Sequence, residues 1–96
     1  MLHILLVRYT VPEAEVAPHV PAHVAHLERH HADGTFLASG QTVPAELGGA
    51  ILAVGDRARI EEIAAADPFA QAGVARYDIV TIDAGRAHPA LRALLG

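Results

Sequence analysis

The hydrophobic and polar residues follow a period that changes along the chain, and each change marks a new predicted element. Residues 2–9 form an apolar run with β-branched content that ends at a Thr-Val-Pro sequence, which predicts a strand. Three later segments are short, apolar or alternating, and are bounded by glycine, proline or aspartate. They predict further strands over residues 35–39, 50–54 and 75–83.

Helical spacing replaces the strand pattern after residue 12, where Val16, Val20, Val24 and Leu27 recur every three or four positions. Two prolines interrupt this segment, and a proline inside a helix costs about 3 kcal/mol or more. We therefore predict a loose turn followed by a helix over residues 21–32, because proline is favoured in a first turn. Gly34 is expected to cap that helix in the left-handed conformation.

A second helix is predicted over residues 57–66, with Asp56 as the N-cap that accepts first-turn N–H groups. Asp67-Pro68 ends it, since the residue before proline avoids helical geometry. Residues 69–73 are predicted to form a short turn. The apolar tail around Leu91, Leu94 and Leu95 is expected to add one last helical turn.

The predicted order is β-α-β-β-α-β, which is typical of the ferredoxin-like α+β fold. Four antiparallel strands then carry two helices on one face of the sheet. The 96 residues suffice for one domain, residues 1–96, with a single core. Because the other face of the sheet has no helices to cover it, we expect a two-fold homodimer.

Composition narrows the classes of function. The net charge is −4, which disfavours nucleic-acid and anionic-membrane partners because these need a basic surface. The absence of cysteine excludes disulfides, thiol catalysis and thiolate metal sites. The N-terminal apolar run is too short for a signal peptide, and no segment has the length of a membrane span, so we expect a cytoplasmic protein.

Histidine is unusually frequent, with seven residues, and four of them lie on one predicted stripe: His19, His23, His26 and His30. His23 is closest to the apolar stripe and is expected to be half-buried at the edge of a cleft. Histidines spaced by three or four residues can chelate zinc or nickel. However, the HExxH pattern is absent and no cysteine could complete a site, so we expect no native metal site.

A histidine can transfer protons near neutral pH, most efficiently when a carboxylate fixes its tautomer. Asp67 is the candidate carboxylate, although an aspartate before proline often only caps a turn. Both interpretations stay open on the residues alone. Nucleophilic catalysis has little support, because Ser39 is the only serine and lies in no Gly-x-Ser-x-Gly motif. Phosphate-loop fingerprints are also absent.

Two motifs resemble those of the YCII-related (YciI-like) domain family. Residues 21–28 (Pro-Ala-His-Val-Ala-His-Leu-Glu) are similar to its Pro-x-His-x-x-x-Leu signature, and residues 33–40 continue the match. Residues 66–69 (Ala-Asp-Pro-Phe) with the later Ala-Gly-Val resemble its second segment. The resemblance implies a dimeric α+β barrel whose active site is a His–Asp pair, here His23 and Asp67. Relatives often carry arginine where Val20 stands, and proline where Gln41 stands, so Gln41 is either a polar cleft residue or loop variation.

We therefore interpret the chain as a lyase- or isomerase-type enzyme without a cofactor, acting by proton transfer on a small organic molecule. His23 is the predicted general base or acid, and Asp67 is predicted to hold its tautomer. The expected substrate contacts are His26, Ser39, Gln41 and Phe69. Two alternatives use the same cleft: a non-catalytic module that binds a small ligand, and a cofactor-independent oxygenase of the dimeric barrel type.

Overall fold

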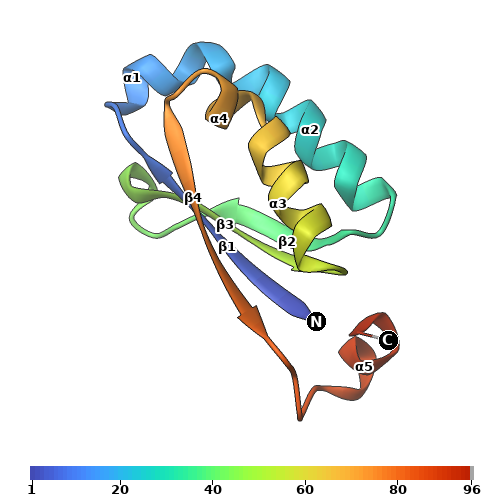
Figure 1. Ribbon diagram of the computed structural model, residues 1–96. Coiled ribbons are helices and arrows are strands. Elements are labelled where there is room, and N and C mark those ends of the chain that lie inside the picture. The colour runs from blue at the N-terminus through green and yellow to red at the C-terminus, as the bar shows by residue number, and fades with distance from the viewer. Residues whose placement is uncertain (96) are drawn as a thin grey trace.

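The computed structural model describes residues 1–95 (Figure 1). Their strands and α-helices are, in chain order, β1 (Leu2–Tyr9), α1 (Glu13–Val16), α2 (Val20–Ala32), β2 (Phe36–Gln41), β3 (Gly48–Val54), α3 (Arg57–Ala66), α4 (Pro68–Gln71), β4 (Ala75–Ile82) and α5 (Pro89–Leu95). Short 3₁₀ helices precede α2 (Ala17–His19) and β3 (Ala45–Leu47).

The four strands form one antiparallel sheet in the order β2-β3-β1-β4. On the central strand β1, Leu5 pairs with Ile51 of β3 and with Ile79 of β4. Helices α2, α3 and α4 lie on one face of this sheet (Figure 1). This arrangement confirms the predicted ferredoxin-like fold. It also places the end of α3 and the start of α4 beside α2.

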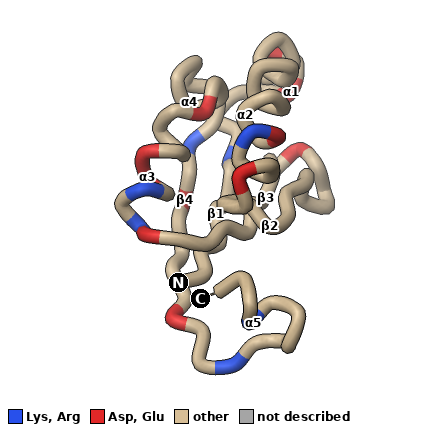
Figure 2. The backbone as a smooth tube through the Cα atoms, turned by 90° about the vertical axis from the view of Figure 1, so that its right-hand side faces the viewer, with Lys and Arg blue, Asp and Glu red and all other residues tan. Residues whose placement is uncertain are grey.

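The core lies between this face of the sheet and the helices. Its most deeply buried apolar side chains, each at most 2% exposed, are Leu5, Val16, Ile51, Ala53 and Ile60. On β4 the inner residues Tyr77 and Ile79 pack against the same cluster, in agreement with the predicted alternation. Acidic and basic residues lie on the helices, the loops and the strand ends around this core (Figure 2).

Proline determines how the first helical segment is divided. Pro18 lies in the 3₁₀ helix and Pro21 in the first turn of α2, so neither removes a hydrogen bond from a helix interior. Helix α2 therefore begins at Val20, one residue before the predicted start. Gly34 adopts the expected left-handed conformation, with φ 84°.

Three local predictions need correction. Asp56 occupies the N-cap position of α3, but its side chain makes no capping hydrogen bond. The predicted turn after Asp67 is instead the short helix α4, because the Asp67 carboxylate accepts the Phe69 N–H and caps it. Strands β2 and β3 are also longer than expected, since their pairing extends as far as Gln41 and Gly49.

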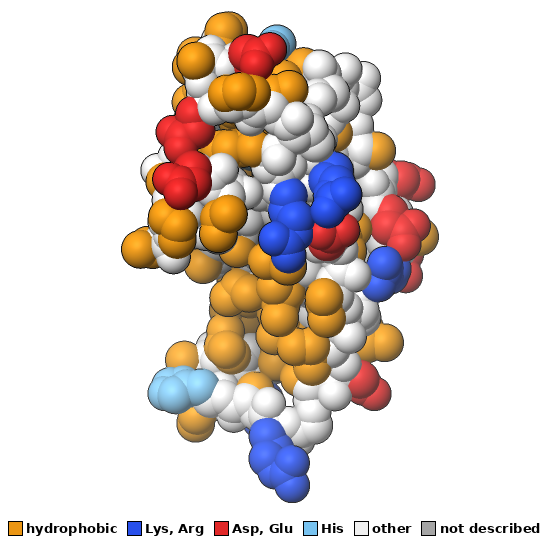
Figure 3. Space-filling view, turned by 90° about the vertical axis from the view of Figure 1, so that its left-hand side faces the viewer, with side chains coloured by type: hydrophobic (Ala, Val, Ile, Leu, Met, Phe, Trp, Pro, Cys, Tyr) orange, Lys and Arg blue, Asp and Glu red, His pale blue; other side chains and the backbone are white. Residues whose placement is uncertain are grey.

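Within residues 1–95, helices α2, α3 and α4 leave the outer face of the sheet uncovered (Figure 1). Its exposed apolar side chains include Leu52, Val80 and Ile82, between 37% and 50% exposed. Arg8 and Asp78 form an exposed ion pair on neighbouring strands. Hydrophobic side chains likewise gather in the middle of the face shown in Figure 3.

The C-terminal helix α5 has no buried residue and lies apart from the helical layer (Figures 1 and 2). No helix within residues 1–95 has both the length and the apolar character that a membrane crossing requires.

Candidate active site

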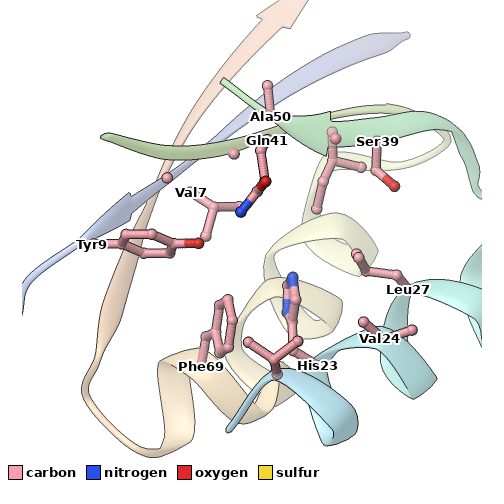
Figure 4. A pocket seen from close by; sticks show the side chains of 14 residues that line it. Val7, Tyr9, His23, Val24, Leu27, Ser39, Gln41, Ala50 and Phe69 are labelled. Carbon is pink, nitrogen blue, oxygen red and sulfur yellow. The ribbon is translucent and has the colours of Figure 1, made fainter. Parts of the chain in front are cut away.

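A cavity of about 270 Å³ opens between helix α2 and the inner face of the sheet (Figure 4). Its polar side chains include His23, Ser39 and Gln41, and most of the remaining lining is apolar. An apolar cavity of about 150 Å³ holds one benzene molecule. The space therefore suits a compound with a single ring and a few substituents.

Close backbone packing shapes the floor of this cavity where β3 begins. Gly48 has φ 128°, and a Cβ atom there would lie 1.9 Å from the carbonyl oxygen of Val7. At Gly49 a Cβ atom would lie 2.9 Å from the carbonyl oxygen of Gly40. The two adjacent glycines thus serve strand packing beside the cavity rather than phosphate binding.

His23 projects from α2 into the cavity, and its Nδ1 lies 2.8 Å from Asp67 Oδ1. The His23 side chain is 13% exposed, whereas Asp67 is fully buried behind it. A carboxylate only accepts hydrogen bonds, so Nδ1 of His23 carries the proton and donates it. In the neutral ring, Nε2 then keeps a lone pair, which is the arrangement that a general base needs.

Asp67 receives three hydrogen bonds. They come from His23 Nδ1, from the hydroxyl of Tyr77, and from the backbone N–H of Phe69 at 2.9 Å. Burial raises the pKa of the Asp67 carboxyl, but the three donors outweigh it and hold this pKa below its ordinary value. Asp67 is therefore ionised at neutral pH. Burial and the adjacent carboxylate raise the pKa of Tyr77, which stays protonated and can donate.

Phe69 fixes the plane of the His23 ring. The two rings are stacked, with centroids 3.8 Å apart and planes 6° from parallel. Tyr9 contacts the edge of Phe69 at a centroid distance of 6.1 Å. Because Asp67 holds one ring atom and Phe69 one ring face, the free Nε2 has a defined direction.

Three of the four predicted substrate contacts lie at the cavity, and the fourth does not. Ser39, Gln41 and Phe69 line the cavity, whereas His26 is absent from its lining. His26 is only 5% exposed, so it is more deeply buried than His23, contrary to the predicted order. Its ring packs near His30 and Phe36. The physical reason is that α2 turns this part of its histidine stripe toward β2, a rotation that spacing along one helix does not define.

The histidines of α2 engage separate partners. His30 bonds Asp33 at 3.1 Å, and Nε2 of His31 lies 2.8 Å from the Ser39 hydroxyl. Within residues 1–95, no group of three or more histidine, aspartate or glutamate residues is arranged to hold a metal ion.

Sequence reasoning missed two contributors, the Tyr77 donor and the His31–Ser39 bond. The sequence alone does not join Tyr77 to Asp67, because Tyr77 lies on β4 and Asp67 lies between α3 and α4. His31 lies at the end of α2, and Ser39 reaches it only because β2 runs back along that helix. An inward tyrosine and a lone serine after a histidine-rich helix were the available signals.

The geometry defines the class of the protein as a ferredoxin-like domain with a cavity that holds a histidine–carboxylate pair. The model of the YCII-related domain matches residues 1–83, and the chain belongs to this family. No curated protein matches the chain. Among solved structures it is similar to the 5-chloro-2-hydroxyhydroquinone dehydrochlorinase TftG of Burkholderia phenoliruptrix AC1100, in complex with 2,5-dihydroxybenzoquinone. That likeness has 20% identity and a TM-score of 0.71, and it covers 88% of this chain and 96% of the other.

Proposed function

We propose that the protein is an enzyme that transfers a proton from carbon in a small cyclic molecule, leading to elimination or isomerisation. This proposal is supported by the hydrogen bonding of the two ring nitrogens of His23. One ring nitrogen is bound to an ionised, buried carboxylate, and the other is free beside a cavity of single-ring size.

In the proposed reaction, Nε2 of His23 takes a proton from an acidic C–H bond, and the released electron pair moves into the substrate. The imidazolium that forms is stabilised by Asp67 through the Nδ1–H bond. In an elimination, the electron pair forms a C=C bond and expels the leaving group. In an isomerisation, His23 returns the proton at another atom.

The solved neighbour supports this choice by analogy. Its activity, dehydrochlorination, removes hydrogen and chlorine from a ring compound, and its bound ligand is a six-membered ring. Since the shared identity is 20%, the comparison bears on the fold, and the proposal for this chain depends on its own His23–Asp67 geometry.

The test uses nitrocyclohexane, a single-ring compound with one acidic C–H beside the nitro group. Its exchange with deuterium in D₂O is followed by proton NMR. We expect the parent protein to accelerate exchange, and His23→Gln to reduce the acceleration by about 100-fold or more. The matched control is His30→Gln on the same helix, because His30 bonds Asp33 and does not line the cavity. Binding of the probe without exchange would favour the ligand-binding module instead.

We also propose that the active form is a homodimer joined through the outer face of the sheet. This assembly is supported by the exposed apolar side chains of Leu52, Val80 and Ile82, which a second copy of the chain would cover. In sedimentation, Val80→Asp should yield monomers, whereas Ala58→Asp on the exposed side of α3 should not. A parent protein that sediments as a monomer at micromolar concentration would contradict this assembly. If deletion of residues 87–96 weakens the dimer, the α5 segment also contributes.

A further inference from the structure

The Ser39–His31 hydrogen bond is the feature of the cavity that the proposed reaction leaves unused. Ser39 lines the cavity from β2, and its hydroxyl lies 2.8 Å from Nε2 of His31. Figure 4 shows that Ser39 comes from the strand on one side of the cavity and His23 from the helix on the other. The cavity therefore has two histidine-linked groups on opposite walls.

The surroundings of His31 suit proton exchange with solvent. Its ring contacts the edge of Phe36, with centroids 5.8 Å apart, and the residue is only half-buried near the end of α2. The Ser39 hydroxyl both donates and accepts hydrogen bonds, so it can pass a proton between the cavity and the imidazole. Asp67, by contrast, is fully buried behind His23 and cannot exchange protons directly with solvent.

We propose that Ser39 and His31 form a second proton-transfer arm, which protonates a substrate oxygen while His23 removes a proton from carbon. This inference rests on the proposed function and makes it more specific. Ser39 is the catalytic residue of the arm because it would touch the substrate. His31 is a positioning residue that supplies Ser39 with its proton.

We assign six-membered cyclic ketones as the substrate class, and the proposed reaction converts the ketone to its enol. Nε2 of His23 takes the proton beside the carbonyl, and the C–H electron pair forms the ring C=C bond. The carbonyl π pair moves to oxygen, which takes the Ser39 proton. Ser39 then takes a proton from the His31 imidazolium, and His31 regains a proton from the solvent. The product is the enol, and no oxidant or reductant is needed.

Two probes of the same ring size distinguish the role of Ser39 and His31 from the role of His23. Cyclohexanone needs both a base and an acid, because its enolate is a strong base that gains from protonation. Nitrocyclohexane needs only the base, since its anion is stable in water. Both are followed by deuterium exchange, with folding of each variant checked by its amide NMR spectrum.

We expect Ser39→Ala to slow cyclohexanone exchange by about 100-fold, and to slow nitrocyclohexane exchange at least tenfold less than that. Ser39→Thr keeps a hydroxyl and should retain most of the activity. His31→Gln keeps a hydrogen-bonding group but cannot titrate, so kcat for cyclohexanone should fall by about tenfold at constant KM. His30→Gln is again the control and should affect neither probe.

Equal losses with both probes in Ser39→Ala, or no loss with cyclohexanone, would overturn the second arm while leaving His23 as the base. If His23→Gln changes neither reaction, the proposed function itself fails. A parent protein that exchanges nitrocyclohexane but not cyclohexanone also contradicts the arm. Absence of exchange for both probes contradicts the proposed function and this inference with it.

Discussion

His3 and His23 both lie between the sheet and the helices, yet their ring nitrogens have different surroundings. His3, on β1, is fully buried, and its Nε2 and Nδ1 bond the Gly55 carbonyl at 2.7 Å and the Thr81 hydroxyl at 2.9 Å. His23 uses only Nδ1, on Asp67, and its ring reaches the cavity. Both tautomers are fixed by an acceptor-only partner, a carbonyl in one case and a carboxylate in the other.

The difference shows which buried histidines are available for chemistry. The hydrogen-bonding capacity of His3 is fully used, and Arg57 adds a further donor to Thr81 at 3.0 Å. That network joins β1, β4 and α3, so its expected role is structural. His23 retains one free nitrogen, and its partner is charged, so it can accept a proton and have the new charge stabilised.

The largest expected effect is the loss of stability on replacing His3. His3→Ala leaves the Gly55 carbonyl and the Thr81 hydroxyl without their partner and opens a cavity in the core. We expect the free energy of unfolding in urea to fall by about 3 kcal/mol. His23→Ala is the comparison and should cost about half as much, because Asp67 keeps two donors and water can enter from the cavity. Equal losses would remove the distinction between the two histidines.

Much of the fold was predictable because its signals are local. The change of period, the prolines before α2 and the positive φ at Gly34 each depend on a few neighbouring residues. The errors also have a local cause. Asp56 stands at the N-cap of α3 without making a capping bond, and the capping preference of Asp67 acts on α4 rather than only ending α3.

The site was predictable only where a motif joined distant residues. His23 and Asp67 are 44 positions apart, and the family resemblance, not periodicity, paired them. The burial of His26 depends on how α2 packs against β2, and the bond from Tyr77 depends on how β4 packs against α4. That packing includes the core residues Val16, Phe36 and Phe69, and spacing along the chain does not encode it.

Replacing the Asp67 carboxylate tests whether the charged partner of His23 is what distinguishes it from His3. Asp67→Asn removes the charge that stabilises the imidazolium and lets an amide face Nδ1. We expect nitrocyclohexane exchange to slow by about 10- to 100-fold. Nitrogen-15 NMR should show a smaller fraction of His23 with the proton on Nδ1. Asp56→Asn is the matched control, since its side chain makes no capping bond. Unchanged exchange and an unchanged tautomer would limit Asp67 to capping α4.

Tyr77 gives a smaller test of the same carboxylate. Tyr77→Phe removes one of three donors to a fully buried group, and we expect the free energy of unfolding to fall by about 1–1.5 kcal/mol. Exchange of nitrocyclohexane should change less than in Asp67→Asn, because the charge and the His23 bond persist. Tyr9→Phe is the control for stability, since its hydroxyl faces the cavity (Figure 4). Identical stability losses in the two variants would show that the Tyr77 bond contributes nothing specific.

The smallest effect concerns His26, a buried histidine of a third kind, whose Nε2 has no hydrogen-bond partner. Burial lowers the pKa of His26, and the attraction of Asp67 opposes this only in part. The unfolded chain therefore binds the proton more readily than the folded one. The resulting stability is present above the ordinary histidine pKa of about 6.5 and is lost as the pH falls below it.

Urea unfolding of the parent and of His26→Leu, measured from pH 7.5 to 5.5, tests this effect. The parent should lose more stability than the variant as the pH falls, because only the parent must protonate this buried ring. At pH 7.5 the variant should be at least as stable, since leucine removes a buried nitrogen that has no partner. Ala25→Leu, at an exposed position on the same helix, changes no titratable group and should keep the slope of the parent. Parallel pH dependences for the parent and His26→Leu would mean that His26 is protonated as easily in the folded protein as in the unfolded chain.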